Sequence, residues 1–191
     1  MNFDLIAIGA SWGGLQAVST VLDGLRSEVD AAIVVVQHRG AQSQRGLLEL
    51  LLAQHVSRPV SEPDDKEPIE RSHVYVAAAD YHLLVEDGHF ALSLEQPVNY
   101  ARPSIDVFFQ SVADAYAERA IGVVLTGANV DGAKGLATIK ERGGVAIVQD
   151  PKTALRGTMP EAAIAATVAD AVLPVEQIAP FLYGLSTPVA R

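Results

Sequence analysis

The chain of 191 residues is 49% hydrophobic and 19% charged, which is typical of a globular domain and excludes a disordered chain. Its net charge of −9, without any cluster among the 14 lysines and arginines, argues against binding to nucleic acid or to an acidic membrane surface. Because cysteine is absent, thiol catalysis, disulfides and thiolate metal sites are excluded. The chain starts without a signal-peptide pattern and has no run long enough for membrane insertion, so we expect a cytoplasmic protein.

The first part of the chain alternates short apolar runs with helical patterns. Leu5–Ile8 is continuously apolar, which predicts a strand that is buried on both faces, and a helix is expected from about Gly13 to Leu25. A second buried strand is predicted over Ala31–Gln37. The leucine-rich stretch Arg45–His55 then predicts a second helix.

The middle of the chain has a different pattern. A short strand is predicted over Val74–Ala77, and two further strand-like runs flank Asp87-Gly88, which is a strong signal for a β-hairpin. Afterwards strands and helices alternate again. Strands are expected at residues 123–125, 145–148 and 171–173, and helices at residues 104–119 and 132–142, from about residue 160 and from residue 176.

This order predicts an α/β fold: a doubly wound, mostly parallel sheet with helices on both faces and an appended antiparallel hairpin. We expect residues 1–191 to form one domain, since no linker or repeat interrupts the pattern. Ligands bind such sheets beyond the carboxyl ends of the strands. The loops after Ile8, Val36 and Leu125 are therefore expected to lie close together.

These three loops carry Ser11, His38 and Asp131. Acyl transfer by a serine requires a base that takes the hydroxyl proton and a carboxylate that holds the imidazole in the right tautomer. Gly9-Ala10-Ser11-Trp12-Gly13 also matches a tight strand-to-helix turn that exposes a nucleophile, and the N–H groups near Trp12 are candidates for an oxyanion hole.

Each residue also has a structural interpretation. A glycine-rich turn after a first strand often binds phosphate or only packs tightly, and a lone histidine at a strand end usually bonds to backbone. Asp131 could simply cap the helix that follows it. We likewise expect Asp106 to be a solvated residue in the first turn of its helix. Composition and spacing leave the catalytic and the structural interpretations equally open.

Five segments, in this order, carry a family resemblance across essentially the whole chain: Ile6–Gly14, Val36–His38, Arg102–Phe109, Leu125–Ala133 and Gly157–Ala162. They resemble the CheB family, the chemotaxis protein-glutamate methylesterases. The resemblance implies a catalytic triad of Ser11, His38 and Asp131. It also implies a substrate, the glutamyl methyl esters on the cytoplasmic helices of chemoreceptors, and members often deamidate receptor glutamines as well.

The chain departs from the family pattern at two loops. Ala128-Asn129-Val130 replaces the usual Met-Gly-x before the catalytic aspartate, so Ala128 is expected to offer only its backbone N–H to an oxyanion. Arg39-Gly40 replaces the usual Met-Pro after the base. Arg39, like Arg45 and Arg102, is a cation that could contact acidic receptor helices. These changes bear on substrate choice more than on chemistry.

Most family members carry a phosphorylatable receiver domain ahead of the catalytic domain. This chain begins almost directly at its first strand, so we expect a catalytic domain that stands alone or is excised from a longer chain. A separate receiver or histidine-kinase component is then a candidate partner. His55, His73 and His89 lack metal-ligand spacing, and the expected chemistry needs no metal or organic cofactor.

Two alternatives remain. A nucleotide-binding oxidoreductase would use the loop from Gly9 to Gly14, but Ser11 occupies the second glycine position of the dinucleotide pattern and no Gly-Lys-Ser/Thr follows. A non-catalytic scaffold that binds receptors or partners is suggested by the two altered loops. Against the scaffold stands the joint presence of Ser11, His38 and Asp131, which binding alone would not need.

Overall fold

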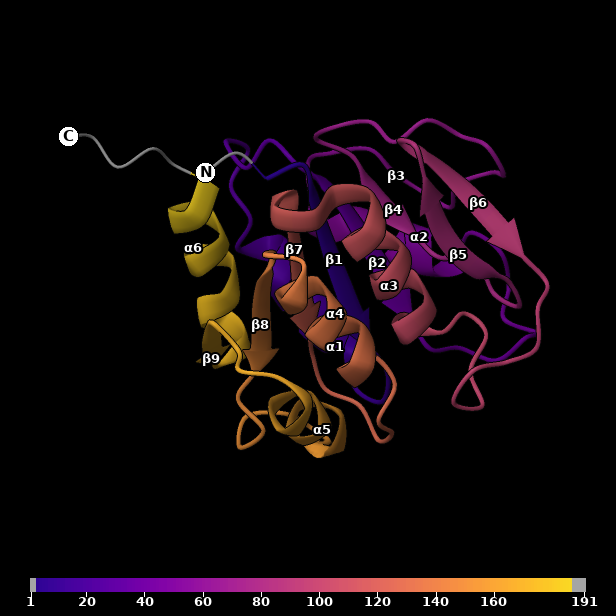
Figure 1. The fold of residues 1–191 in the computed structure, drawn as a ribbon. Helices are drawn as coiled ribbons and strands as arrows, with labels where there is room; N and C mark the ends of the chain where they lie inside the picture. The colour runs from indigo at the N-terminus through magenta and orange to yellow at the C-terminus, as the bar shows by residue number, and fades with distance from the viewer. Residues whose placement is uncertain (1–2, 187–191) are drawn as a thin grey trace.

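The computed structural model describes residues 3–186. At its centre lies a parallel sheet of seven strands (Figure 1). The strand order is β3-β4-β2-β1-β7-β8-β9. All of the strand pairs in this sheet are parallel. The strands are β1 (Leu5–Ala10), β2 (Ala32–Gln37), β3 (Val60–Ser61), β4 (Val74–Val76), β7 (Ala120–Val124), β8 (Val145–Gln149) and β9 (Ala171–Leu173).

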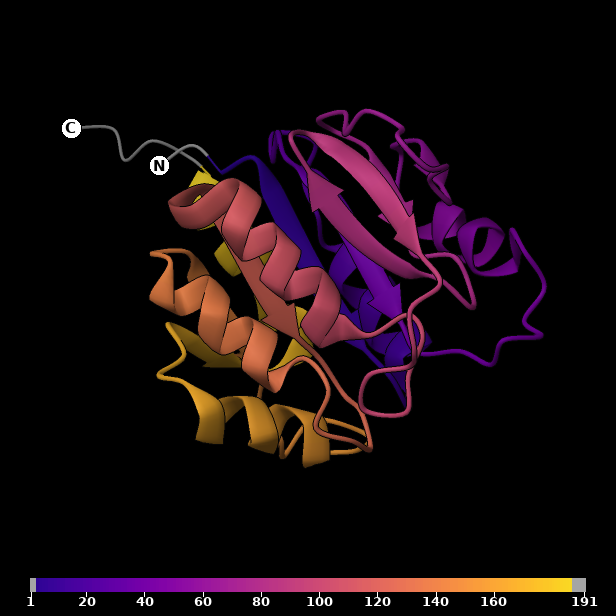
Figure 2. The same ribbon diagram turned by 45° about the vertical axis from the view of Figure 1, so that its right-hand side comes forward.

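Helices cover both faces of the sheet (Figures 1 and 2). One face packs against α1 (Gly14–Asp23), α2 (Leu47–Leu52) and α6 (Val175–Ser186). The other face packs against α3 (Ile105–Tyr116), α4 (Ala133–Glu141) and α5 (Thr158–Ala166). The structure thereby confirms the predicted doubly wound α/β fold.

The pleat of β1 explains why this strand lies at the centre. Ile6 and Ile8 point into the core under α1, whereas Leu5 and Ala7 point into the core under α3, and all four are fully buried. Burial of each large aliphatic side chain contributes about 1.5–3 kcal/mol. A strand that is buried on both faces needs apolar residues at every position, which is the pattern seen in the sequence.

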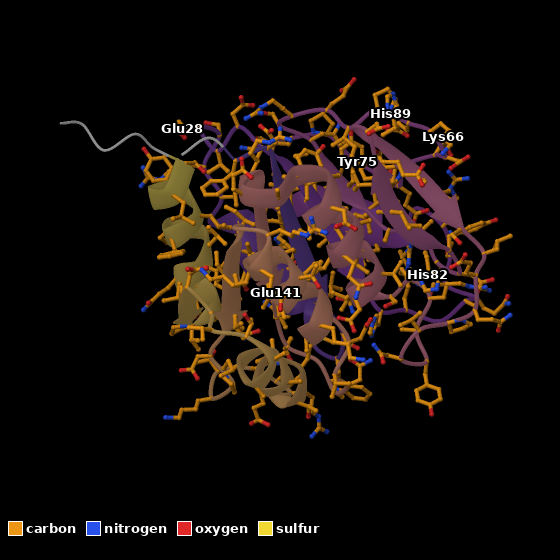
Figure 3. All side chains as sticks on the ribbon, viewed as in Figure 1. Glu28, Lys66, Tyr75, His82, His89 and Glu141 are labelled. Carbon is orange, nitrogen blue, oxygen red and sulfur yellow. The ribbon has the colours of Figure 1, made fainter. Side chains whose placement is uncertain are left out.

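The hairpin of β5 (His82–Glu86) and β6 (His89–Ser93) forms a separate antiparallel layer beside α3. Its turn residues Asp87 and Gly88 both have positive φ, as a tight two-residue hairpin requires. Phe90 packs edge-on against Tyr75 of β4, with ring centroids 4.7 Å apart. Figure 3 shows His82 near the end of the hairpin opposite to His89.

The structure differs from the sequence prediction at three places. Strand β3 was not predicted, because a strand of two residues has no readable period. The helix expected over residues 45–55 is the short α2 followed by a 3-10 turn, η1 (Ala53–His55), and it begins only after Gly46, whose φ is 78°. Helix α3 ends at Tyr116, and a second 3-10 turn, η2 (Ala117–Arg119), follows it. None of the helices within residues 3–186 is both long and apolar enough to span a membrane.

Candidate active site

The candidate site lies where the winding of the sheet reverses. The chain passes from β1 to β2 on one side and later to β7 on the other side of β1, and in such sheets this reversal opens a crevice at the carboxyl ends. Ser11 follows β1 directly, and its N–H donates to Thr126 O beyond β7 at 3.0 Å. His38 follows β2, and its N–H donates to Ala10 O at 3.0 Å. Asp131 lies in the loop after β7.

The three side chains form a continuous chain of hydrogen bonds. Ser11 Oγ lies 3.2 Å from His38 Nδ1, and His38 Nε2 lies 2.8 Å from Asp131 Oδ2. The histidine side chain is 12% exposed and the aspartate side chain is fully buried. The sequence therefore predicted correctly that these three residues come together, although they are separated by 27 and 93 positions.

Asp131 is held as a carboxylate by five donors. Besides His38, it accepts hydrogen bonds from the Asn99 amide at 3.0 Å and the Ser104 hydroxyl at 2.9 Å. The backbone N–H groups of Ile105 and Asp106, in the first turn of α3, donate at 2.6 and 3.2 Å. The N-terminus of α3 thus directs its positive dipole end at the carboxylate.

The electrostatics of this pocket select one tautomer of His38. Burial alone would raise the pKa of Asp131, but the hydrogen bonds from His38, Asn99 and Ile105 outweigh burial, so its pKa is lower than usual. An ionised carboxylate can only accept a hydrogen bond. Nε2 of His38 must therefore carry the proton, and the lone pair of Nδ1 faces Ser11.

A tight turn presents Ser11 at the end of β1. Gly13 has a φ of 79°, a backbone conformation that side chains disfavour, and a Cβ at Gly14 would lie 2.0 Å from Gln37 Oε1. The Gln37 amide occupies that space, and its Nε2 donates to Ser11 O at 2.8 Å and to His38 O at 3.1 Å. Gln37 therefore fixes the serine loop relative to the histidine loop.

Two backbone donors near Ser11 suit an oxyanion. Among the acceptors of residues 3–186, none receives a hydrogen bond from Trp12 N–H or Ala128 N–H. The Ser11–Trp12 peptide that carries Trp12 N–H is held by Gln37, which donates to Ser11 O, and Thr126 Oγ1 donates to Trp12 O in the next peptide at 2.9 Å. The Trp12 side chain is 61% exposed and does not pack under a loop, and the Arg156 guanidinium lies 5.9 Å from the centre of its ring.

Two of the polar residues around the triad were not predicted. Asn99 bridges two carboxylates, with its Nδ2 at 3.0 Å from Asp131 Oδ1 and 2.9 Å from Asp106 Oδ2. Asn129 lies on the other side of the imidazole, with its Nδ2 at 3.2 Å from His38 Nδ1. Asparagine in a loop has no periodic signal, so only the position of Asn129 two residues before Asp131 pointed to the site.

The expectation that Asp106 is solvated is wrong. Its residue is 3% exposed, and its carboxylate accepts hydrogen bonds from Gly135 N at 2.8 Å and from Asn99. Burial and the neighbouring charge of Asp131 raise the pKa of Asp106, and the hydrogen bonds from Gly135 and Asn99 only partly oppose them. Asp106 therefore belongs to the buried hydrogen-bond network that Asn99 connects to Asp131.

The arginines that were candidates for receptor contacts are largely engaged within the chain. Arg39 has a side chain that is 9% exposed and donates to Glu62 Oε1 at 2.5 Å and to Ala77 O at 2.7 Å. Arg102 pairs with Asp80 at 2.6 Å. Arg45 pairs with Asp64 at 3.0 Å, but its side chain is 74% exposed. Where the family usually has Met-Pro, this chain therefore has a buried and paired arginine, Arg39, and not an exposed cation.

A cleft of about 580 Å³ opens beside the imidazole. Its walls include His38 and Asn129 on one side and the loop from Pro97 to Pro103 on the other. No group of three or more His, Asp or Glu side chains that could hold a metal ion is found within residues 3–186. The cleft is open to solvent and can admit a side chain of another protein.

A sequence model of CheB methylesterase matches residues 6–182. The chain belongs to the CheB methylesterase family. A relative from Leptospira interrogans is 47% identical over 180 residues, which cover 94% of this chain and 93% of the relative. The protein-glutamate methylesterase/protein-glutamine glutaminase 1 of Rhodospirillum rubrum is 39% identical, over 94% of this chain but only 48% of its own length.

Solved structures agree with this family. The catalytic domain of CheB methylesterase from Thermotoga maritima is 32% identical and superposes with a TM-score of 0.88, over 97% of this chain and all of that domain. The similarity confirms both the predicted family and the predicted fold of a parallel sheet with an appended hairpin. This chain is therefore a methylesterase of the CheB family.

Proposed function

We propose that the chain hydrolyses glutamyl methyl esters on chemoreceptor cytoplasmic helices, with Ser11 as nucleophile, His38 as general base and Asp131 as the orienting carboxylate. The observation that carries this proposal is the unbroken chain of hydrogen bonds from Ser11 Oγ through His38 to the buried Asp131. The Rhodospirillum relative, a protein-glutamate methylesterase/protein-glutamine glutaminase, supports the substrate class.

The geometry suggests the following reaction. Ser11 Oγ attacks the ester carbonyl while His38 Nδ1 takes its proton, and the ionised Asp131 stabilises the imidazolium through Nε2–H. The oxyanion is stabilised by the N–H groups of Trp12 and Ala128, each worth about 10²–10³-fold in rate. His38 then protonates the departing methanol, and water hydrolyses the acyl-enzyme by the same route. Deamidation of a glutamine would follow these steps with ammonia as the leaving group.

The open cleft supports a macromolecular substrate. An esterified glutamate on a helical receptor must reach Ser11 while its helix stays outside, which requires a shallow site. Ser11 is half-buried and His38 lines the cleft, which is bordered by the exposed residue Tyr100, whereas Asp131 lies buried behind them. We place the reaction in the cytoplasm, where the receptor helices lie, and we propose a receiver or histidine-kinase component as the source of regulation.

The two alternatives fit the structure less well. A dinucleotide-binding loop needs glycines that leave space for pyrophosphate, but a Cβ at Gly9 would lie 2.4 Å from Ile105 Cγ2, so this glycine serves packing against α3. A scaffold without activity would not need a buried carboxylate with five donors behind a histidine and a serine.

Methanol release from a methylated chemoreceptor cytoplasmic fragment tests the proposal. We expect release by the wild type and a loss of about 10⁴–10⁶-fold in the Ser11→Ala variant. Ser27→Ala, which alters an exposed serine beyond α1, is the matched control and should retain full activity. Absence of release by a folded wild type, or release by Ser11→Ala at the wild-type rate, would contradict the proposal.

A further inference from the structure

Asn129 makes two hydrogen bonds that fix the orientation of its amide. Its Oδ1 accepts from Asp131 N at 3.2 Å, so its Nδ2 must be the group that faces His38 Nδ1 at 3.2 Å. Nδ1 is therefore approached by two donors, the amide of Asn129 and the hydroxyl of Ser11. The Asn129 amide competes with the nucleophile for the lone pair of the base.

This arrangement distinguishes between the two protonation states of the imidazole. The neutral form, with its proton on Nε2 toward Asp131, offers a lone pair on Nδ1 that accepts from Asn129. The imidazolium carries a hydrogen on Nδ1 as well, and this N–H would point at the N–H of the amide. Two opposed donors repel each other, and the amide loses its acceptor. The Nδ1–H of the imidazolium is left with the Ser11 hydroxyl oxygen as its acceptor.

We propose that Asn129 is a positioning residue whose amide occupies the lone pair of His38 Nδ1 in the resting site and disfavours the binding of a solvent proton there. The inference rests on the proposed function only in assigning His38 as the base. Protonation by solvent is opposed by Asn129, whereas transfer of the Ser11 proton requires the amide to release Nδ1 as substrate binds. The hydrogen bond from Asn129 to Nδ1 is therefore present in the resting site and absent while the reaction takes place.

Other charges near the imidazole act in both directions, and the cations Arg39 and Arg102 along the cleft disfavour the imidazolium as the Asn129 amide does. Asp131 contacts the imidazole directly and favours the imidazolium, which is the opposite sign. The remaining charged groups lie along the cleft or behind Asn99, and substitutions at Asn129 leave them in place: Arg39, Asp80, Arg102 and Asp106. A change in protonation after such a substitution therefore reports on the amide itself.

Asn129→Leu is the decisive variant because it removes the donor toward His38 without adding charge, although it also loses the bond to Asp131 N. Asn129→Asp conserves size and keeps an oxygen acceptor for Asp131 N. Its negative charge favours the imidazolium by itself, so it marks the upper end of the expected shift. Val130→Ala alters the next residue, whose side chain is 55% exposed, and serves as the control for the loop.

Titration of the His38 imidazole by NMR tests the inference without any substrate, with His38→Gln used to assign the signal among the five histidines. Relative to wild type and Val130→Ala, we expect the midpoint to rise by about half to one pH unit in Asn129→Leu. In Asn129→Asp it should rise by about one to two units. The acid limb of the kcat/KM profile for ester hydrolysis should move in the same order.

An unchanged midpoint in Asn129→Leu would overturn the inference and leave Asn129 with a role in the loop alone. Equal shifts in Val130→Ala and Asn129→Leu would overturn it as well, because the effect would then come from the loop. If the wild type released no methanol from receptor, the proposed substrate would fail. The NMR midpoints would still decide the role of Asn129.

Discussion

Asp131→Asn replaces one carboxylate oxygen by an amide nitrogen in a pocket where five donors converge. If the new NH₂ takes the place of Oδ1, it faces the donors of Asn99 and Asp106, and only the Ser104 hydroxyl can turn to accept from it. If it takes the place of Oδ2, it faces Ile105 N–H and His38 Nε2. The imidazole can respond by moving its proton to Nδ1.

The second orientation is favoured because it leaves one buried donor, Ile105 N–H, without an acceptor instead of two. The Asn129 amide also loses Nδ1 as its acceptor, but Asn129 is only half-buried and can turn to solvent. Each buried donor without a partner costs about 1–3 kcal/mol, so the difference is large enough to set the orientation. His38 then presents an N–H to Ser11 and cannot take its proton. By analogy with the same change in the serine protease triad, kcat should fall about 10⁴-fold.

The Asp131→Asn variant should still fold. One unpaired backbone donor and a weaker hydrogen bond to His38 predict a loss of about 1–3 kcal/mol, against a total stability of about 5–15 kcal/mol for a domain of this kind. Methanol release measures kcat, and urea denaturation followed by circular dichroism measures the free energy of unfolding. A folded variant with activity within tenfold of wild type would refute the reasoning.

Two further predictions concern the same carboxylate. The folded-state pKa of Asp131 is lowered, so its contribution to stability is present above its unfolded value of about 4 and is lost as pH falls through the folded value. Urea denaturation from pH 7 to pH 3 should therefore show a steeper acid loss in wild type than in Asp131→Asn, and equal slopes would contradict this assignment. Ser104→Ala removes both the cap that accepts from Val107 N and a donor to Asp131. It should cost about 1–2 kcal/mol in urea denaturation, and an unchanged midpoint would show that the cap is dispensable.

The fold and the convergence of Ser11, His38 and Asp131 could be predicted because both depend on patterns that extend over whole elements. The patterns alone left the catalytic interpretation open, and the family resemblance favoured it. Continuous apolar runs identified the buried strands, and parallel strands end at one edge of the sheet. Ser11, His38 and Asp131 each follow such a strand closely, so their convergence could be predicted without coordinates. A helix was also expected to begin at residue 104, where Ser104 caps α3.

The surroundings of the triad could not be predicted in the same way. Asp106 is buried because α4 approaches α3 at Gly135, where a Cβ would lie 2.5 Å from Phe109 Cβ, and no helical period reveals that contact. Arg39 is buried by Glu62, which lies 23 positions further along the chain. Asn99 reaches Asp131 from a loop whose path is set by tertiary contacts, so its role became visible only in three dimensions.

The central claim, an activated serine at position 11, is tested most directly by labelling with a fluorophosphonate and mapping the adduct by mass spectrometry. The account predicts one adduct on the peptide that contains Ser11, formed at least about 10²-fold more slowly in His38→Gln. His55→Gln, which alters a histidine paired with Asp23 away from the site, should label at the wild-type rate. An adduct on another residue, or equal labelling rates in wild type and His38→Gln, would contradict the account.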